Sequence, residues 1–184
     1  MKSYTRGAHI GIFFVMVFLL LVTACSDDRQ ADVANMPVAI HDGDECHVCG
    51  MLITNFPGPK GEAYMAGQKQ VLKFCSTRDL FAHLLQPEVI PNVREIYVHD
   101  MGATDWDHPA DNVLIDARTA WYVADQPLKG AMGPTLASFK DKEAAEVFAK
   151  KHNGRVLKFE EVTLEVISKL AACKVPHLAR ASGG

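Results

Sequence analysis

Two successive stretches of the chain repeat one order of elements, and this repetition constrains the fold more than any other feature of the sequence. In the first stretch, short apolar-rich runs at 63–66 and 70–74 flank a Gly-containing turn, which predicts a hairpin. Ser76 then opens a Ser-x-x-Asp helix start, and apolar residues follow at helical spacing until Pro87 ends the helix. Residues 94–99 are expected to return as a strand.

The second stretch follows the same order with different residues. Strands are expected at 120–124 and 135–139, a helix at 141–152 with Asn153-Gly154 as its C-cap, and a final alternating strand at 155–162. Phenylalanine also ends the second strand of each stretch, just before the helix. The sequence therefore predicts an α+β fold of two β-β-α-β units forming a pseudo-repeat.

The N-terminus has the pattern of a processing signal, which is set apart from the folded body. Lys2 and Arg6 form a basic start, and the apolar run 10–21 is shorter than a membrane-spanning helix needs. The run leads to a small residue before Cys25, as in the bacterial lipobox, where the cysteine is cleaved on its N-terminal side and acylated. An ordinary signal peptide or an uncleaved anchor is the alternative. Ser26, by resemblance to sorted lipoproteins, favours the outer membrane, with the folded body on the periplasmic side.

Cleavage before Cys25 leaves enough chain for one ordinary domain or two small fused units. The polar stretch after it is expected to act as a tether from the membrane. The predicted parts are a signal peptide (1–24), a lipidated tether (25–43), a first unit (44–110), a second unit (111–167) and a flexible tail (168–184).

Composition limits the function. A formal net charge of −3 and a pI near 6.2 give no basic footprint for nucleic acid. Of five cysteines, four remain once Cys25 is assigned to lipid: Cys46, Cys49, Cys75 and Cys173. Outside the cytoplasm, disulfide bonding is the default for such a set, so any functional thiol pair must be argued against it.

One short segment concentrates soft metal ligands: Cys46-His47-Val48-Cys49-Gly50-Met51. Thiolate and thioether sulfur select Cu(I) over hard cations. Gly50 permits a turn with positive φ, which lets the sulfur of Met51 fold back toward Cys49. The segment therefore favours a Cu(I) site.

Other chemistries of a Cys-x-x-Cys pair compete with copper. Gly50 occupies the position where a c-type haem site needs histidine. A structural zinc site needs four ligands, which Cys75 and His83 could complete, although their spacing matches no standard zinc pattern. A redox pair is disfavoured by Asp44 and Glu45, whose charges oppose a thiolate, and by the lack of a βαβ pattern. Redox chemistry and an inert disulfide nevertheless remain open.

Taken together, these features resemble the NosL-type copper chaperones, accessory lipoproteins for nitrous oxide reductase assembly. The resemblance rests on the lipobox at Cys25 and on Cys46-x-x-Cys49-Gly50-Met51, and it extends to about Val162. It is carried further by His99-Asp100 before Trp106, by Trp121-Tyr122 ahead of Gly130-Ala131-Met132-Gly133, and by Gly154-Arg155-Val156. Two departures are Ala131, where the family often has proline, and Cys75-Ser76, where it commonly has acidic residues.

The resemblance implies a fold of two β-β-α-β units, a monovalent, sulfur-bound copper and no enzymatic activity. It also implies delivery to nitrous oxide reductase, through a membrane ABC-type assembly complex. Met132 lies in a turn, where a methionine can either bind metal or fill a gap. We therefore expect Cu(I) to be bound by Cys49 and Met51, with Cys46 and Met132 as further ligands. The alternative function is a periplasmic thiol-disulfide oxidoreductase that uses Cys46 and Cys49.

Overall fold

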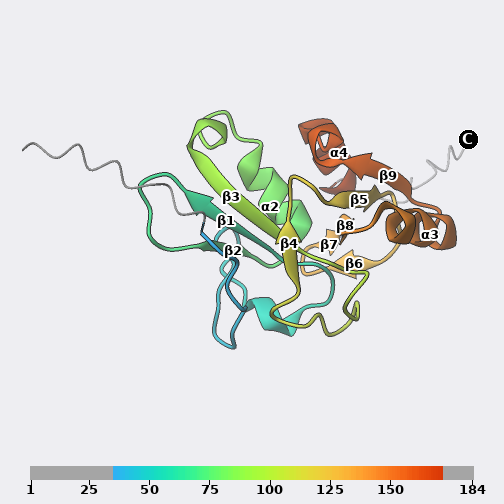
Figure 1. The fold of residues 1–184 in the computed structure, drawn as a ribbon, viewed down its shortest axis with the longest axis horizontal. Coiled ribbons are helices and arrows are strands. Elements are labelled where there is room, and N and C mark those ends of the chain that lie inside the picture. Colours follow the sequence, from blue (N-terminus) through green and yellow to red (C-terminus); the bar gives the residue numbers. More distant parts are fainter. Residues whose placement is uncertain (1–34, 172–184) are drawn as a thin grey trace, which may run out of the picture. The chain divides into compact units, whose positions relative to one another are not determined.

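The computed structural model describes residues 35–171 (Figure 1). The predicted signal peptide, Cys25 and Cys173 lie outside these residues. Within residues 35–171, no helix combines the length and the apolar character that a bilayer crossing requires.

The first sheet has the strand order β2-β1-β3-β4, and every neighbouring pair is antiparallel. Helix α2 connects β2 to β3, and its N-terminus is capped by Ser76, whose hydroxyl accepts a hydrogen bond from the Asp79 amide. The predicted helix start is therefore confirmed. The elements of this half are η1 (Ile53–Asn55), β1 (Gly61–Met65), β2 (Leu72–Phe74), α2 (Thr77–Leu84), η2 (Ile90–Asn92), β3 (Val93–His99) and β4 (Leu114–Asp116).

The second sheet has the order β8-β5-β9, with α3 between β8 and β9. Asn153 ends α3 in the left-handed conformation, with φ at 54°, as the Asn-Gly C-cap predicts. The elements are β5 (Trp121–Ala124), β6 (Lys129–Gly130), β7 (Gly133–Pro134), β8 (Ala137–Phe139), α3 (Lys142–His152), β9 (Arg155–Lys158), η3 (Phe159–Glu161) and α4 (Leu164–Ala171).

The predicted α+β class is confirmed, and in each half the first strand lies between the second and the third. The halves are not exact copies. Strand β4 extends the first sheet only, and the β6–β7 ribbon is inserted only in the second half.

Several expected boundaries are wrong. Strand β4 pairs with β3, so the first unit extends beyond residue 110. The last strand ends at Lys158, and a 3-10 turn replaces its expected end. Helix α4 occupies the start of the expected tail and buries Leu170, because its apolar residues recur at helical spacing and pack on the core.

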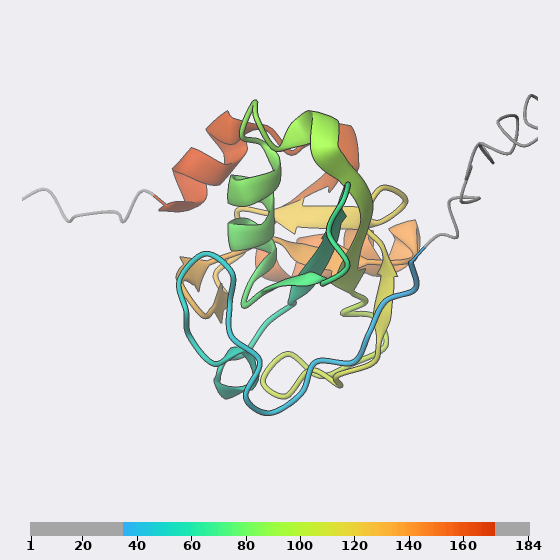
Figure 2. The same ribbon diagram turned by 90° about the vertical axis from the view of Figure 1, so that its left-hand side faces the viewer.

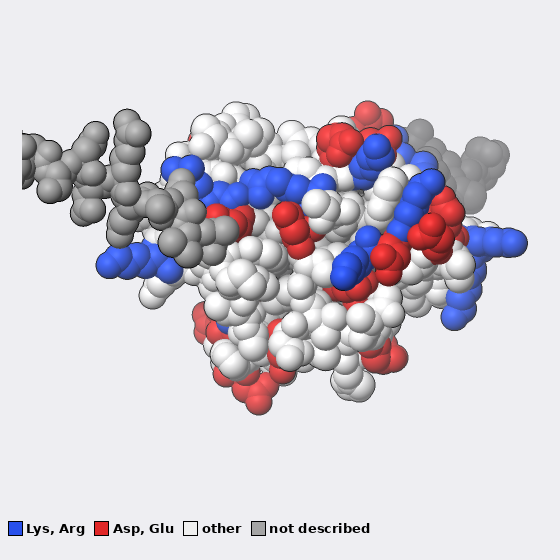
Figure 3. All heavy atoms as spheres, in the orientation of Figure 1, with Lys and Arg blue, Asp and Glu red and all other residues white. Residues whose placement is uncertain are grey.

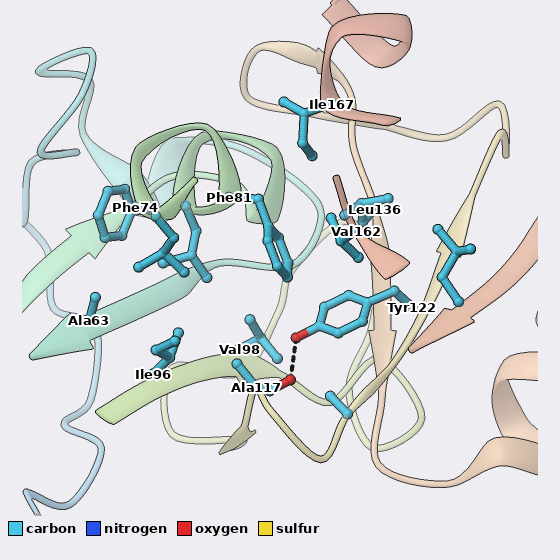
Figure 4. Packing of buried hydrophobic residues seen from close by; sticks show 14 of the residues in the cluster. Ala63, Phe74, Phe81, Ile96, Val98, Ala117, Tyr122, Leu136, Val162 and Ile167 are labelled. Carbon is cyan, nitrogen blue, oxygen red and sulfur yellow. Dashed lines mark hydrogen bonds between the residues drawn. The ribbon is translucent and has the colours of Figure 1, made fainter. Parts of the chain in front are cut away.

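The largest group of buried apolar side chains joins the two halves (Figure 4). Phe81 of α2 packs edge-on against Tyr122 of β5, with ring centroids 5.1 Å apart. The Tyr122 hydroxyl donates a 2.6 Å hydrogen bond to the carbonyl of Ala117, in the segment between the two sheets. The two predicted units therefore share one core.

Residues 35–43 were expected to belong to the tether, but the structure places them against the first sheet (Figure 2). Ile40 is only 1% exposed, and the Val38 amide donates to the buried carboxyl of Glu62. The Tyr64 hydroxyl donates to the carbonyl of Met36. This part of the expected tether is therefore folded, because it covers apolar surface and pairs with polar groups of β1.

Candidate metal centre

The loop that carries Cys46 is closed by backbone hydrogen bonds. Glu45 and Leu52 form an isolated antiparallel bridge, and the Cys46 amide donates to the carbonyl of Met51 at 2.9 Å. The Gly50 amide donates back to the Cys46 carbonyl at 2.8 Å. Gly50 has φ at 69°, as predicted, and this left-handed conformation lets so short a loop turn.

Strand β2 holds this loop against the first sheet. The His47 amide donates to the carbonyl of Lys73 at 2.8 Å. The Lys73 ammonium forms an ion pair with Asp44 and donates to the Ala39 carbonyl. Cys75 follows Lys73 by two residues. The contacts with Lys73 therefore hold the loop close to a third cysteine.

Cys75 occupies the junction between β2 and α2, directly before the cap residue Ser76. Its side chain is fully buried, and its thiol donates a 3.2 Å hydrogen bond to the carboxylate of Asp79 in the first turn of α2. Asp79 also accepts from the Ser76 hydroxyl at 3.0 Å. The helix start therefore orients both Cys75 and Asp79.

Four side chains converge at this point: Cys46, Cys49, Cys75 and Asp79. Their ligand atoms all lie within 4.8 Å of one another, and the Sγ atoms of Cys49 and Cys75 are 3.5 Å apart. Three sulfur atoms this close can bind one soft ion after small movements. We call these four residues the thiol cluster.

The surroundings of the thiol cluster are largely apolar. Cys46 and Cys75 pack with Ile40 and Ile53 in a small buried group, while Cys49 is only half-buried. The side chains of Met51 and Ala131 contact the same group. The cluster is therefore shielded on the protein side and reachable through Cys49.

The cysteines share their protons unequally. A hydrogen bond with Cys75 lowers the pKa of Cys46, and the same interaction, together with burial, raises the pKa of Cys75. A cluster with one thiolate is thus favoured over a fully protonated cluster. Ionisation of all three thiols requires a bound cation.

The predicted methionine ligands differ in position. Met51 is half-buried beside the cysteines. Met132 lies in the turn between β6 and β7, where its side chain is 45% exposed and its carbonyl accepts a 2.6 Å hydrogen bond from Arg78. The neighbouring Ala131, not Met132, packs on the cluster.

Sequence reasoning missed two members of the cluster. From the sequence, Cys75 is only a departure from the family pattern and a possible zinc ligand, and Asp79 is only part of a helix start. The sequence signal for both was their place at a strand-to-helix junction, one residue and five residues after Phe74. The suggested zinc ligand His83 lies outside the cluster and packs edge-on against His47, with ring centroids 4.9 Å apart.

Comparison with known proteins identifies one family. The family model described as NosL matches residues 37–167, which is most of the chain. The chain belongs to the NosL family. A copper-binding lipoprotein NosL from Stutzerimonas stutzeri is 44% identical over 162 residues, covering 88% of this chain and 84% of that protein. A copper-binding lipoprotein NosL from Achromobacter cycloclastes is 34% identical over 155 residues, covering 82% and 79%.

Among solved NosL structures, the fold is similar to the crystal structure of the copper chaperone NosL from Shewanella denitrificans. The TM-score is 0.69 at 48% identity, and the match covers 71% of this chain and 97% of that one. Family membership and the thiol cluster together support copper binding. The α+β fold is thus shared with a relative that is named as a copper chaperone.

Proposed function

We propose that this protein carries Cu(I) on the periplasmic side of the cell envelope and delivers it for assembly of the copper centres of nitrous oxide reductase. The observation that carries this proposal is the thiol cluster, whose three thiols can bind a soft monovalent ion. Membership of the NosL family supports the copper assignment. The receiving enzyme follows from the family resemblance.

In this proposal Cys46, Cys49 and Cys75 are the thiolate ligands. Asp79 offers a hard oxygen, so its role is to orient Cys75 in the metal-free protein, where its carboxylate accepts a hydrogen bond from the Cys75 thiol. Met51 supplies a thioether from beside the cluster, and Met132 supplies another from the β6–β7 turn. Copper itself is cargo, not a resident cofactor, and the protein is not an enzyme.

Transfer would proceed by ligand exchange. Cys49 is the most exposed of the three cysteines, so an incoming sulfur ligand can displace it while the two buried thiols still hold the ion. The proposed receivers are nitrous oxide reductase and its membrane ABC-type assembly complex. The proposed anchor is a lipid on Cys25 in the outer membrane.

The test is an anaerobic Cu(I) titration of the reduced protein against a competing chromophoric chelator. We expect one tightly bound Cu(I) per chain, and loss of that site in the Cys46→Ser/Cys49→Ser double variant. Unchanged stoichiometry and affinity in the double variant would exclude this site. If the wild-type protein binds no Cu(I) but its Cys46–Cys49 couple has an oxidising potential, the thiol-disulfide oxidoreductase reading is correct.

Two further experiments test place and destination. Metabolic labelling with a radioactive fatty acid should be lost in Cys25→Ala, and the protein should then leave the membrane fraction. Copper-loaded protein, mixed with the assembly complex and copper-free nitrous oxide reductase, should restore the absorption of the reductase's copper centres. The same mixture with the double cysteine variant should not.

A further inference from the structure

Lys60 occupies an unusual position for a lysine, because it is only 2% exposed. It directly precedes β1, where Gly61 pairs with Phe74. Cys75 directly follows Phe74, so Lys60 and Cys75 flank the last pair of this antiparallel ladder. On its other side, Lys60 exchanges hydrogen bonds with His99: its amide donates to Nδ1 and its carbonyl accepts from the His99 amide.

The ammonium group of Lys60 has no carboxylate partner among residues 35–171. Its hydrogen bonds run to the carbonyls of Phe56 and Pro57, at 2.6 and 2.9 Å. Burial lowers the pKa of Lys60 to about 8, and a negative charge on Cys75 acts in the opposite direction. Burying a cation without a counter-ion costs free energy. We therefore expect a negative charge to form near Lys60 when the protein functions.

The other cations close to the thiol cluster already have anionic partners. Lys73 pairs with Asp44, and Arg78 pairs with Asp79. Residues 41–59 contain neither lysine nor arginine, although Asp42, Asp44 and Glu45 fall within them. In Figure 3 the loops along the lower edge of the molecule correspondingly show acidic side chains.

Copper loading increases the need for a positive charge. Three thiolates around one Cu(I) carry a net charge of −2, in a site that is mostly shielded from water. The buried charge of Lys60 interacts with Cys75, and it interacts strongly with such a complex because solvent screens it little.

We propose that Lys60 is the counter-charge of the thiol cluster: its ammonium stabilises the thiolates and thereby raises the affinity for Cu(I). This proposal rests on the proposed function, since it concerns the same site. The Lys60 ammonium bonds to backbone carbonyls and is not among the proposed ligands, so it acts on the site through its charge.

A purely structural role would be to hold the 56–57 carbonyls, and three variants separate the two roles. Lys60→Gln keeps an N–H donor but removes the charge, Lys60→Arg keeps both, and Lys60→Met removes both. Lys129→Gln, which removes one exposed lysine near the β6–β7 turn, is the control for net charge. Circular dichroism establishes that each full-length variant is folded.

The first readout is Cu(I) affinity by chelator competition. We expect Lys60→Gln and Lys60→Met to bind about tenfold more weakly, Lys60→Arg to remain within about twofold of wild type, and Lys129→Gln to be unchanged. The second readout needs no metal: the rate at which iodoacetamide alkylates Cys49 at pH 7, followed by mass spectrometry of its peptide. That rate should fall in the Gln and Met variants and recover in the Arg variant.

The outcomes are distinguishable. Wild-type affinity and alkylation in Lys60→Gln would overturn the proposal, as would an equal loss in folded Gln and Arg variants. If the Gln and Met variants do not fold, a folded Arg variant that binds more than tenfold more weakly also contradicts it. If wild type binds no Cu(I) while alkylation still depends on the charge, the proposed function fails and the role of Lys60 toward the thiolates stands.

Discussion

The sulfur atoms of Cys49 and Cys75 lie 3.5 Å apart, although the two residues are 26 positions apart in the sequence. The closure of the Cys46 loop and its attachment to β2 bring them together. The Cys-x-x-Cys pair thereby becomes part of a three-thiol group, which offers Cu(I) a third soft ligand.

Cys75→Ser should weaken Cu(I) binding by at least about tenfold, because a soft thiolate is replaced by a hydroxyl that does not ionise. Serine can still donate to Asp79, so the helix start is retained. The measurement is chelator competition under anaerobic conditions. Cys173→Ser, which removes a cysteine that is not part of the described cluster, is the matched control. Equal affinities for Cys75→Ser and wild type would remove Cys75 from the ligand set.

Met51→Leu should weaken Cu(I) binding more than Met132→Leu does. Met51 already packs beside the cysteines, whereas the exposed Met132 side chain must be ordered before it can bind, at a cost in entropy. X-ray absorption at the copper edge should show fewer sulfur neighbours in the variant that has lost a ligand. A larger loss of affinity in Met132→Leu would reverse the assignment.

Tyr122→Phe should lower the free energy of unfolding by about 1–3 kcal/mol, because the buried Ala117 carbonyl loses its hydrogen-bond donor. Urea unfolding measures the change. Tyr97→Phe is the control: the Tyr97 hydroxyl also donates a 2.6 Å hydrogen bond to a carbonyl, that of Asn35, but at an exposed site. We expect its effect to stay below about 1 kcal/mol, and similar losses for both variants would argue against burial as the cause.

Ionisation of the Glu62 carboxyl should lower the free energy of unfolding as the pH rises. Burial raises the pKa of its carboxyl from the ordinary 4.5 to about 7, and its Oε1 has no hydrogen-bond partner in the described part of the chain. Between these two values the unfolded chain binds fewer protons than the folded one, so stability declines through this range and then levels off. The decline attributable to Glu62 is about 2–3 kcal/mol.

Glu62→Gln isolates this effect, since glutamine can still accept from the Val38 amide. The advantage of the variant over wild type in urea unfolding should grow from pH 4.5 to 7 and stay constant above pH 7. The comparison must be between these two proteins, because burial lowers the pKa of His99 to about 4, which acts in the opposite direction between pH 4 and 6.5. A constant difference across the range would show that Glu62 ionises normally.

Local sequence patterns determined much of the fold. Ser76 and Asn153 cap their helices as predicted, because capping depends on side chains within one turn of the helix. The order of strands and helices in each half also followed from short-range periodicity. The pairing of β4 with the first sheet did not, since a three-residue strand has little pattern and joins whichever edge the tertiary structure offers.

For the site, the sequence by itself determined the chemistry, because Cys46, Cys49 and Met51 are close along the chain and their softness is a property of the residues. Only the tertiary structure decided which distant residues join them. It brought in Cys75 and Asp79 through the β2–α2 junction and kept the Met132 side chain at the surface. The physical reason is that ligand distances depend on strand register and on burial of the loop against the sheet, and no spacing in the sequence encodes these.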